Sequence, residues 1–133
     1  MMLPKGTNVA VADGERLNLF RNAGDETALR LAPVAHEAVG RDNQRSGSRQ
    51  TSPSNPDESQ ANEDNFSASV MDYLNKEVLG GRISGLVIIG APRALGEMRK
   101  HYHKALSAIL LGEISKDLTG HPVADVEAAI RGA

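Results

Sequence analysis

The 133-residue sequence contains no cysteine and no tryptophan, and it has only two phenylalanines and two tyrosines. The absence of cysteine excludes disulfide bonds, thiol catalysis, thiolate metal sites and iron–sulfur clusters. The shortage of aromatic side chains leaves few rings for the stacking platforms that hold unpaired bases in many RNA-binding domains. We therefore expect an aliphatic core and no base-stacking surface.

The chain also lacks an excess of charge of either sign, because 15 basic and 17 acidic side chains leave a net charge of -2. No overall field attracts nucleic acid or an anionic membrane, so any such surface must be local. No apolar run approaches the roughly 18 residues of a membrane span, and the N-terminal residues lack the apolar core of a signal peptide. We expect a cytoplasmic protein without a membrane span.

What the sequence does contain fits one globular domain over residues 1–133, since 40% of the residues are hydrophobic. Apolar residues alternate over 7–12 and 15–20, on either side of Asp13-Gly14, a dipeptide typical of type I′ hairpin turns. A second turn signal at 22–25 precedes a third alternating stretch over 27–34. These patterns predict three antiparallel strands.

Residues 40–61 differ from the rest in having no large apolar side chain and many Arg, Ser and Pro residues. Loops of this length inside a compact domain are usually functional or disordered. We predict a long, flexible, solvated loop between the third strand and the first helix.

Helical periodicity follows the loop. A cap at Asn62 and acidic residues Glu63 and Asp64 precede an apolar stripe that ends before Gly80-Gly81; the stripe consists of Phe66, Val70, Tyr73, Leu74 and Val78. The apolar run 86–89 predicts a strand covered on both faces. A second helix begins at Pro92, with a stripe of Leu95, Met98, Tyr102 and Leu106.

The C-terminal region completes the pattern. Residues 108–115 fit a further strand, although continuation of the second helix is an alternative, and a last helix begins at Pro122 with Val126 and Ile130 facing inward. The expected fold is α/β, a mixed five-stranded sheet in the order βββαβαβα, which is the order of ribonuclease H-like domains. That analogy concerns the fold only.

Two groups of residues are candidate binding sites. The turn Gly90–Gly96 lies where a buried strand passes into a helix, a position at which open α/β sheets bind ligands. A tight structural turn in which Gly96 allows close helix packing is the favoured explanation, because the glycine spacing of known phosphate-binding loops is absent. A basic surface consists of Arg93, Arg99, Lys100 and Lys104 on the second helix, joined by Arg41, Gln44, Arg45 and Arg49 from the loop. The alternative for these basic residues is an ordinary solvated surface.

Metal chemistry is not expected. A two-metal nuclease needs converging carboxylates, whereas Asp13 is explained by the hairpin turn, Glu63 and Asp64 are explained by the helix start, and the central strand ends without an acid. His101 and His103 are two apart on a predicted helix and would point away from each other. We therefore predict neither a metal nor a cofactor.

Several stretches together resemble the bacterial host attachment protein family. They are Leu3-Pro4-Lys5-Gly6, Val11-Ala12-Asp13-Gly14-Glu15, Leu19-Phe20-Arg21-Asn22, residues 91–100 with Ala-Pro-Arg-Ala-Leu-Gly-Glu, and residues 116–123 with Lys-Asp-Leu-Thr. That family in turn is similar to the middle domain of archaeal and eukaryotic class 1 peptide-release factors. The resemblance implies the same order of strands and helices. In those release factors a Gly-Gly-Gln tip follows the third strand, but the matching residues 40–48 contain no Gly-Gly-Gln.

The resemblance and the local charge favour a non-enzymatic binding protein that contacts the ribosome or structured RNA and affects attachment indirectly. One alternative is a small hydrolase acting at the Gly90–Gly96 turn, with Arg93 holding an anionic group. Another is a protein–protein interaction module with a protein partner.

Overall fold

The computed structural model describes residues 1–39 and 56–133. Its five strands form one sheet in the order β3-β2-β1-β4-β5. The β1–β2 and β2–β3 pairs are antiparallel, while β1–β4 and β4–β5 are parallel. The elements are β1 (Asn8–Ala12), β2 (Leu17–Asn22), β3 (Leu31–Pro33), α2 (Pro56–Leu79), β4 (Leu86–Gly90), α3 (Pro92–Arg99), α4 (Lys104–Ile109), β5 (Leu110–Ser115) and α5 (Val123–Arg131). The predicted α/β class with a mixed five-stranded sheet is confirmed.

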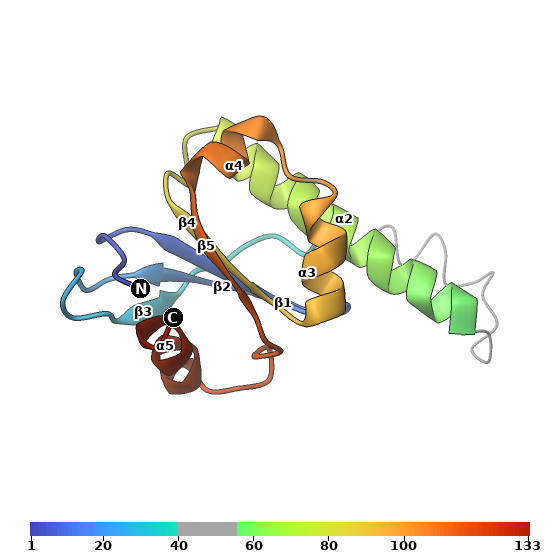
Figure 1. Cartoon of the computed structure of the whole chain (residues 1–133). Coiled ribbons are helices and arrows are strands. Elements are labelled where there is room, and N and C mark those ends of the chain that lie inside the picture. The colour runs from blue at the N-terminus through green and yellow to red at the C-terminus, as the bar shows by residue number, and fades with distance from the viewer. Residues whose placement is uncertain (40–55) are drawn as a thin grey trace.

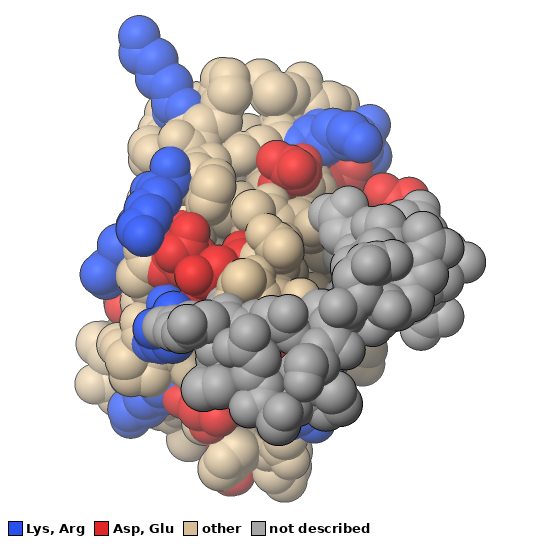
Figure 2. Space-filling model, turned by 90° about the vertical axis from the view of Figure 1, so that its right-hand side faces the viewer, with Lys and Arg blue, Asp and Glu red and all other residues tan. Residues whose placement is uncertain are grey.

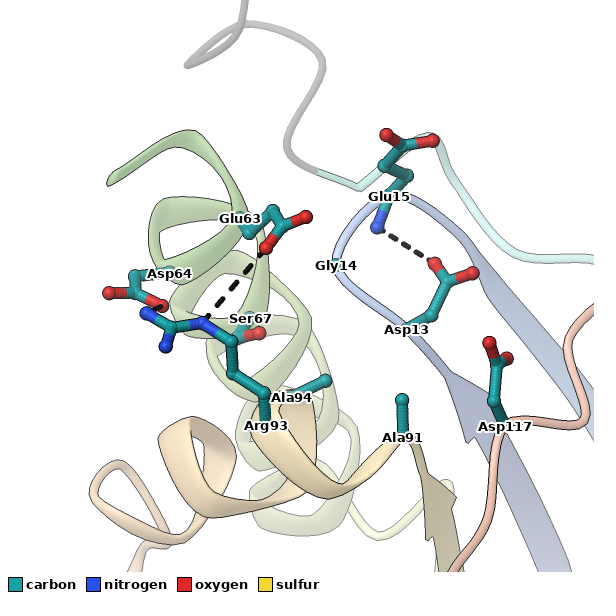
Figure 3. A pocket seen from close by; sticks show the side chains of 10 residues that line it. All are labelled: Asp13, Gly14, Glu15, Glu63, Asp64, Ser67, Ala91, Arg93, Ala94 and Asp117. Carbon is teal, nitrogen blue, oxygen red and sulfur yellow. Dashed lines mark hydrogen bonds and ion pairs between the residues drawn. The ribbon is translucent and has the colours of Figure 1, made fainter. Parts of the chain in front are cut away.

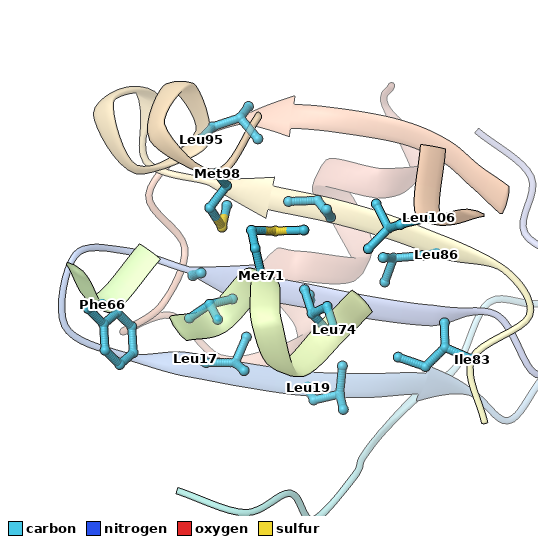
Figure 4. Close-up of a cluster of buried hydrophobic side chains, with 14 residues drawn as sticks. Leu17, Leu19, Phe66, Met71, Leu74, Ile83, Leu86, Leu95, Met98 and Leu106 are labelled. Carbon is cyan, nitrogen blue, oxygen red and sulfur yellow. The ribbon is translucent and has the colours of Figure 1, made fainter. Parts of the chain in front are cut away.

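Helices cover both faces of the sheet (Figure 1). On one face α2, α3 and α4 pack on a cluster that includes Ala10 and Ala12 from β1 (Figure 4). On the other face α5 packs on Val9 and Val11 from the same strand. Strand β4 alternates in the same way, which confirms the prediction that it is covered on both faces.

The first three strands overlap the stretches that the alternation predicts, but β2 is shifted by two residues and β3 is shorter. Strand β2 begins at Leu17 because residues 13–16 form the turn. Strand β3 begins only at Leu31, because the Asp25 carboxylate accepts hydrogen bonds from the N–H groups of Thr27 and Ala28 and holds that stretch in a turn.

Strand β3 forms an edge of the sheet, as Pro33 indicated. Val34, the next residue, donates its N–H to Leu19 O of β2 at 2.8 Å. Because backbone N–H groups alternate between the two sides of a strand, the N–H of Leu31 points away from β2. Leu31 N–H donates instead to Glu127 Oε2 of α5 at 2.8 Å. A side chain from the helix below thus binds the edge of the sheet.

Helix α2 is longer at its N-terminus than expected, since it begins at Pro56 and not at Asn62. Residues 56–61, predicted to be loop, are therefore helical, while residues 40–55 of the predicted loop lie outside the described part of the chain. Phe66, Val70 and Leu74 of the predicted stripe are buried. The helix ends before Gly80-Gly81, and Gly81 adopts the positive φ of 78° that favours glycine.

The second predicted helix is interrupted. Helix α3 ends at Arg99, and α4 begins at Lys104 with His103 as its N-cap, whose Nδ1 accepts the Ala105 N–H at 2.9 Å. Asn75 of α2 holds the break, because its side chain donates to His101 O at 2.9 Å and accepts from His103 N at 3.1 Å. The prediction that His101 and His103 lie on one helix is therefore wrong.

Of the two remaining C-terminal predictions, the first is confirmed in part and the second in full. Residues 104–109 are helical and 110–115 are a strand, so both alternatives for this stretch held in part. Helix α5 follows Pro122 and buries Val126 and Ile130.

None of the helices in the described residues has an apolar stretch of the length needed to cross a bilayer.

Candidate functional site

A cavity of about 390 Å³ lies where β1 and β4 end, between the hairpin turn, α2 and the start of α3 (Figure 3). It includes part of the Gly90–Gly96 turn singled out from the sequence. Its wall is strongly acidic. The lining residues are Asp13, Gly14, Glu15, Glu63, Asp64, Ser67, Ala91, Arg93, Ala94 and Asp117.

The hairpin turn positions Asp13 by hydrogen bonds rather than by an unusual backbone. Asp13 Oδ1 accepts the N–H groups of Glu15 at 2.8 Å and Arg16 at 2.7 Å. The type I′ prediction was wrong, because the only positive φ angles in the described residues are those of Gly6 and Gly81. Gly14 serves another purpose: a Cβ there would lie 2.8 Å from Glu63 Cγ, so glycine lets the turn approach α2.

The buried Thr119 joins the hairpin to the segment after β5. Its Oγ1 lies 2.7 Å from Asp13 Oδ2 and 3.0 Å from Asp117 Oδ1. A hydroxyl has one hydrogen, so it donates to only one of these carboxylates at a time. Arg16 Nη2 approaches both Thr119 Oγ1, at 3.3 Å, and Asp13 Oδ2, at 3.4 Å.

These contacts decide the ionisation of Asp13. Partial burial opposes the charged form, but the hydrogen bonds from Thr119 and from the backbone of Glu15 and Arg16, with the charge of Arg16, outweigh it. The pKa of Asp13 is consequently held below its ordinary value. The hairpin carboxylate is thus a fixed negative charge at the cavity wall.

Arg93 lies opposite Asp13 and faces two acids of α2. Its Nη2 is 3.4 Å from Asp64 Oδ1 and its Nε is 4.0 Å from Glu63 Oε2. Glu63 and Asp64 are well inside α2, so their earlier interpretation as first-turn charges was wrong. An anionic substrate group would compete with both carboxylates for Arg93, which weighs against the hydrolase alternative.

Nothing in the sequence groups these carboxylates, whereas the structure brings five of them to one cavity. No spacing rule links the turn, α2 and the segment after β5, so only the fold could show this. Among the described residues, however, no three acidic or imidazole side chains are placed to hold a metal ion.

Two more of the predicted basic residues, Arg99 and Lys100, also face carboxylates. Arg99 Nε and Nη2 donate to Glu113 Oε1 at 3.0 and 2.8 Å, and Lys100 Nζ donates to Glu97 Oε1 at 3.0 Å. The hydrogen bonds from Arg99 lower the pKa of Glu113 against partial burial. With Arg93 also paired, the described part of this surface carries little excess positive charge, and Figure 2 shows acidic and basic groups interspersed on one face.

Comparison with protein-family models shows to which family the chain belongs. The family model of bacterial archaeo-eukaryotic release factor family 12 matches residues 6–130. The chain belongs to this family. No curated protein matches the sequence. The release-factor part of the resemblance found in the sequence is thereby confirmed, while the resemblance to host attachment proteins stays a prediction.

The stretches that carried the resemblance meet at two places in this member of family 12. Residues from the second, fourth and fifth stretches, among them Asp13, Arg93 and Asp117, line the acidic cavity. Residues of the first and third, among them Lys5 and Arg21, line cavities elsewhere on the sheet.

The remaining predicted binding residues of the family 12 protein, Arg41, Gln44, Arg45 and Arg49, lie outside the described residues. Lys104 is exposed at the start of α4. The predicted basic surface, half of which lies outside the described residues, therefore stays a prediction.

Proposed function

We propose that this protein is a non-enzymatic binding protein that contacts the ribosome through its release-factor-like domain. Membership of release factor family 12 carries the proposal. In the class 1 release factors that the sequence resembles, the segment after the third strand enters the ribosome. The corresponding segment here precedes α2, whose first turns reach past the end of the sheet (Figure 1).

The charge balance of the described residues indicates where RNA contacts would have to come from. Arg93, Arg99 and Lys100 are already paired with carboxylates, so they release less free energy on meeting a phosphate. Residues 41–49 contain three arginines and one aspartate. In this proposal Arg41, Arg45 and Arg49 contact rRNA phosphates, with Gln44 between them, and Lys104 adds to the same surface.

In this proposal the protein affects attachment to host cells only indirectly, as a consequence of ribosome binding.

Co-sedimentation with ribosomes over a range of salt concentrations tests this function. Each lost phosphate contact reduces the slope of log affinity against log salt by roughly 0.7 to 0.9, so the Arg41→Ala, Arg45→Ala, Arg49→Ala variant should lose a slope of roughly 2 to 3. The matched control removes the same charge from exposed sites of the described surface: Arg30→Ala, Lys116→Ala, Arg131→Ala.

The control variant should bind like the wild type. Absence of binding at low salt, binding that does not respond to salt, or equal losses in the two variants would each overturn the proposal.

A further inference from the structure

A larger cavity, of about 590 Å³, lies at the opposite end of the sheet from the acidic one. It is bounded by the N-terminal ends of β1 and β4, the last turns of α2 and the β2–β3 edge. The two cavities lie at opposite ends of the five-residue strand β1, which is about 16 Å long at 3.3 Å per residue. Its size is in the range of pockets that hold small organic ligands, about 300 to 1,000 Å³.

Two polar side chains are buried in the floor of this cavity. Thr7 is 4% exposed and Asn8 is 7% exposed. Their backbone groups are bonded, but neither the Thr7 hydroxyl nor the Asn8 amide has a hydrogen-bond partner among the described residues. Their polar atoms are nevertheless open to the cavity, because no fully buried side-chain nitrogen or oxygen of the described residues lacks a hydrogen-bond partner. A ligand in the cavity can therefore form hydrogen bonds with both.

Two cations stand at the mouth of the cavity. Arg21 of β2 is directly opposite Asn8 of β1 in the antiparallel register, so both side chains share one face of the sheet. The Arg21 guanidinium also passes over Gly6, where a Cβ would lie 3.6 Å from Nη2, and so approaches the segment that carries Lys5. Both side chains are exposed and line this cavity.

Neighbouring carboxylates are already engaged. Glu77 Oε2 is held by Arg82 Nε at 2.6 Å. Lys5 interacts electrostatically with Asp25, but Asp25 Oδ1 accepts from Thr27 Oγ1 at 2.9 Å and from Ala28 N at 2.8 Å. Among the described residues Arg21 has no ion pair. Among the described residues that line the cavity, the three cations Lys5, Arg21 and Arg82 outnumber the single carboxylate, Glu77.

The rest of the wall is apolar. Leu19, Val34 and Tyr73 line one side, and Leu111, 48% exposed, lines another. At Gly85 the floor has no side chain: a Cβ there would lie 3.5 Å from Thr7 Oγ1 and 3.8 Å from Leu111 Cδ1. The pocket thus combines a cationic mouth, a polar floor and an apolar wall.

We propose that this cavity binds a phosphate monoester of nucleotide size. Lys5 and Arg21 hold the phosphate, Thr7 and Asn8 supply hydrogen bonds to the sugar or base, and the apolar wall packs against the ring. This assignment does not rest on ribosome binding, because it uses none of the residues between 40 and 55.

Titration of the full chain with each of the four nucleoside 5′-monophosphates, followed by amide NMR spectra, tests the proposal. Two parallel probes each carry one part of the ligand: adenosine lacks the phosphate, and inorganic phosphate lacks the sugar and base. We expect shifts centred on Thr7, Asn8 and Gly85 with at least one monophosphate, and weaker binding of both half-probes.

Variants separate the site from general attraction to charge. Lys5→Gln and Arg21→Gln should each weaken the binding about tenfold or more, because a charge-assisted hydrogen bond contributes about 1.5–3 kcal/mol. Thr7→Val keeps the shape and should weaken it by a smaller factor. Arg30→Gln and Lys116→Gln, elsewhere on the surface, should leave it unchanged.

The same spectra show whether each variant is folded. The proposal is overturned if no monophosphate shifts these amides at millimolar concentration and low salt, or if Arg21→Gln and Arg30→Gln weaken the binding equally. Inorganic phosphate binding as tightly as the nucleotides would also overturn it, since the apolar wall would then have no role.

Discussion

Thr119 Oγ1 has two carboxylate neighbours, Asp13 and Asp117, and only one hydrogen to donate. The shorter contact is to Asp13, which also accepts two backbone N–H groups. The charge of Asp13 is therefore stabilised by folding, while the hairpin and the segment after β5 are tied together. This single residue links two stretches more than 100 positions apart in the chain.

The first prediction concerns pH. Folding lowers the pKa of Asp13 below its ordinary value of 3.8, so its charge contributes stability above that pH, and the contribution is lost as the pH falls through the folded pKa. Asp13→Asn, which keeps one acceptor oxygen, should cost about 1 kcal/mol at neutral pH and progressively less below pH 3.8. Urea unfolding at several pH values measures this; a constant difference at every pH would contradict it.

The helices and strands were predicted correctly where hydrophobic periodicity alone determines the secondary structure. The alternation in β1 and the stripe of α2 each correspond to one observed face. The interruption between α3 and α4 was missed because Met98 and Leu106 keep helical spacing across it and both reach the core. What breaks the helix is Asn75, whose contacts with the break are long-range in sequence.

Two glycines provide a paired prediction for these elements. Gly96 was thought to allow close helix packing, but a Cβ there meets no described atom within 4 Å. Gly96→Ala should therefore stabilise the protein by about 0.5–1 kcal/mol, because alanine favours a helix interior. In Gly24→Ala the new Cβ would overlap the carbonyl of Ala28, so a loss of about 1–3 kcal/mol is expected. Thermal unfolding compares the two, and stabilisation by both would contradict the packing described here.

At the scale of the whole molecule, the sites were harder to predict than the fold. Acids from the hairpin, α2 and the segment after β5 converge only because parallel strands end at the same edge of the sheet. The cavity with Thr7 and Asn8 was missed altogether. Its one sequence signal was that Lys5 and Arg21 lie in two stretches of the family resemblance, and nothing in their spacing places them side by side.

The two hydrophobic clusters share β1 and β4, which send alternate side chains to each face. Losing one cluster would expose these strands to water, so we predict that residues 1–133 unfold as a single domain in one transition. Methyl NMR signals of Val70 and Leu106 on one face, and of Val126 and Ile130 on the other, should disappear at the same urea concentration. Earlier loss of the α5 face would show two independent units.

The edge strand β3 has a consequence for how the protein behaves at high concentration. An open sheet edge invites strands of other molecules when its outward N–H groups are unoccupied. Here the outward N–H of Leu31 is already bonded to Glu127, and Pro33 has no N–H to offer. A second chain that approached this edge would find only carbonyl acceptors and no free donor on β3 itself. One glutamate and one proline thus oppose edge-to-edge aggregation on this side of the sheet.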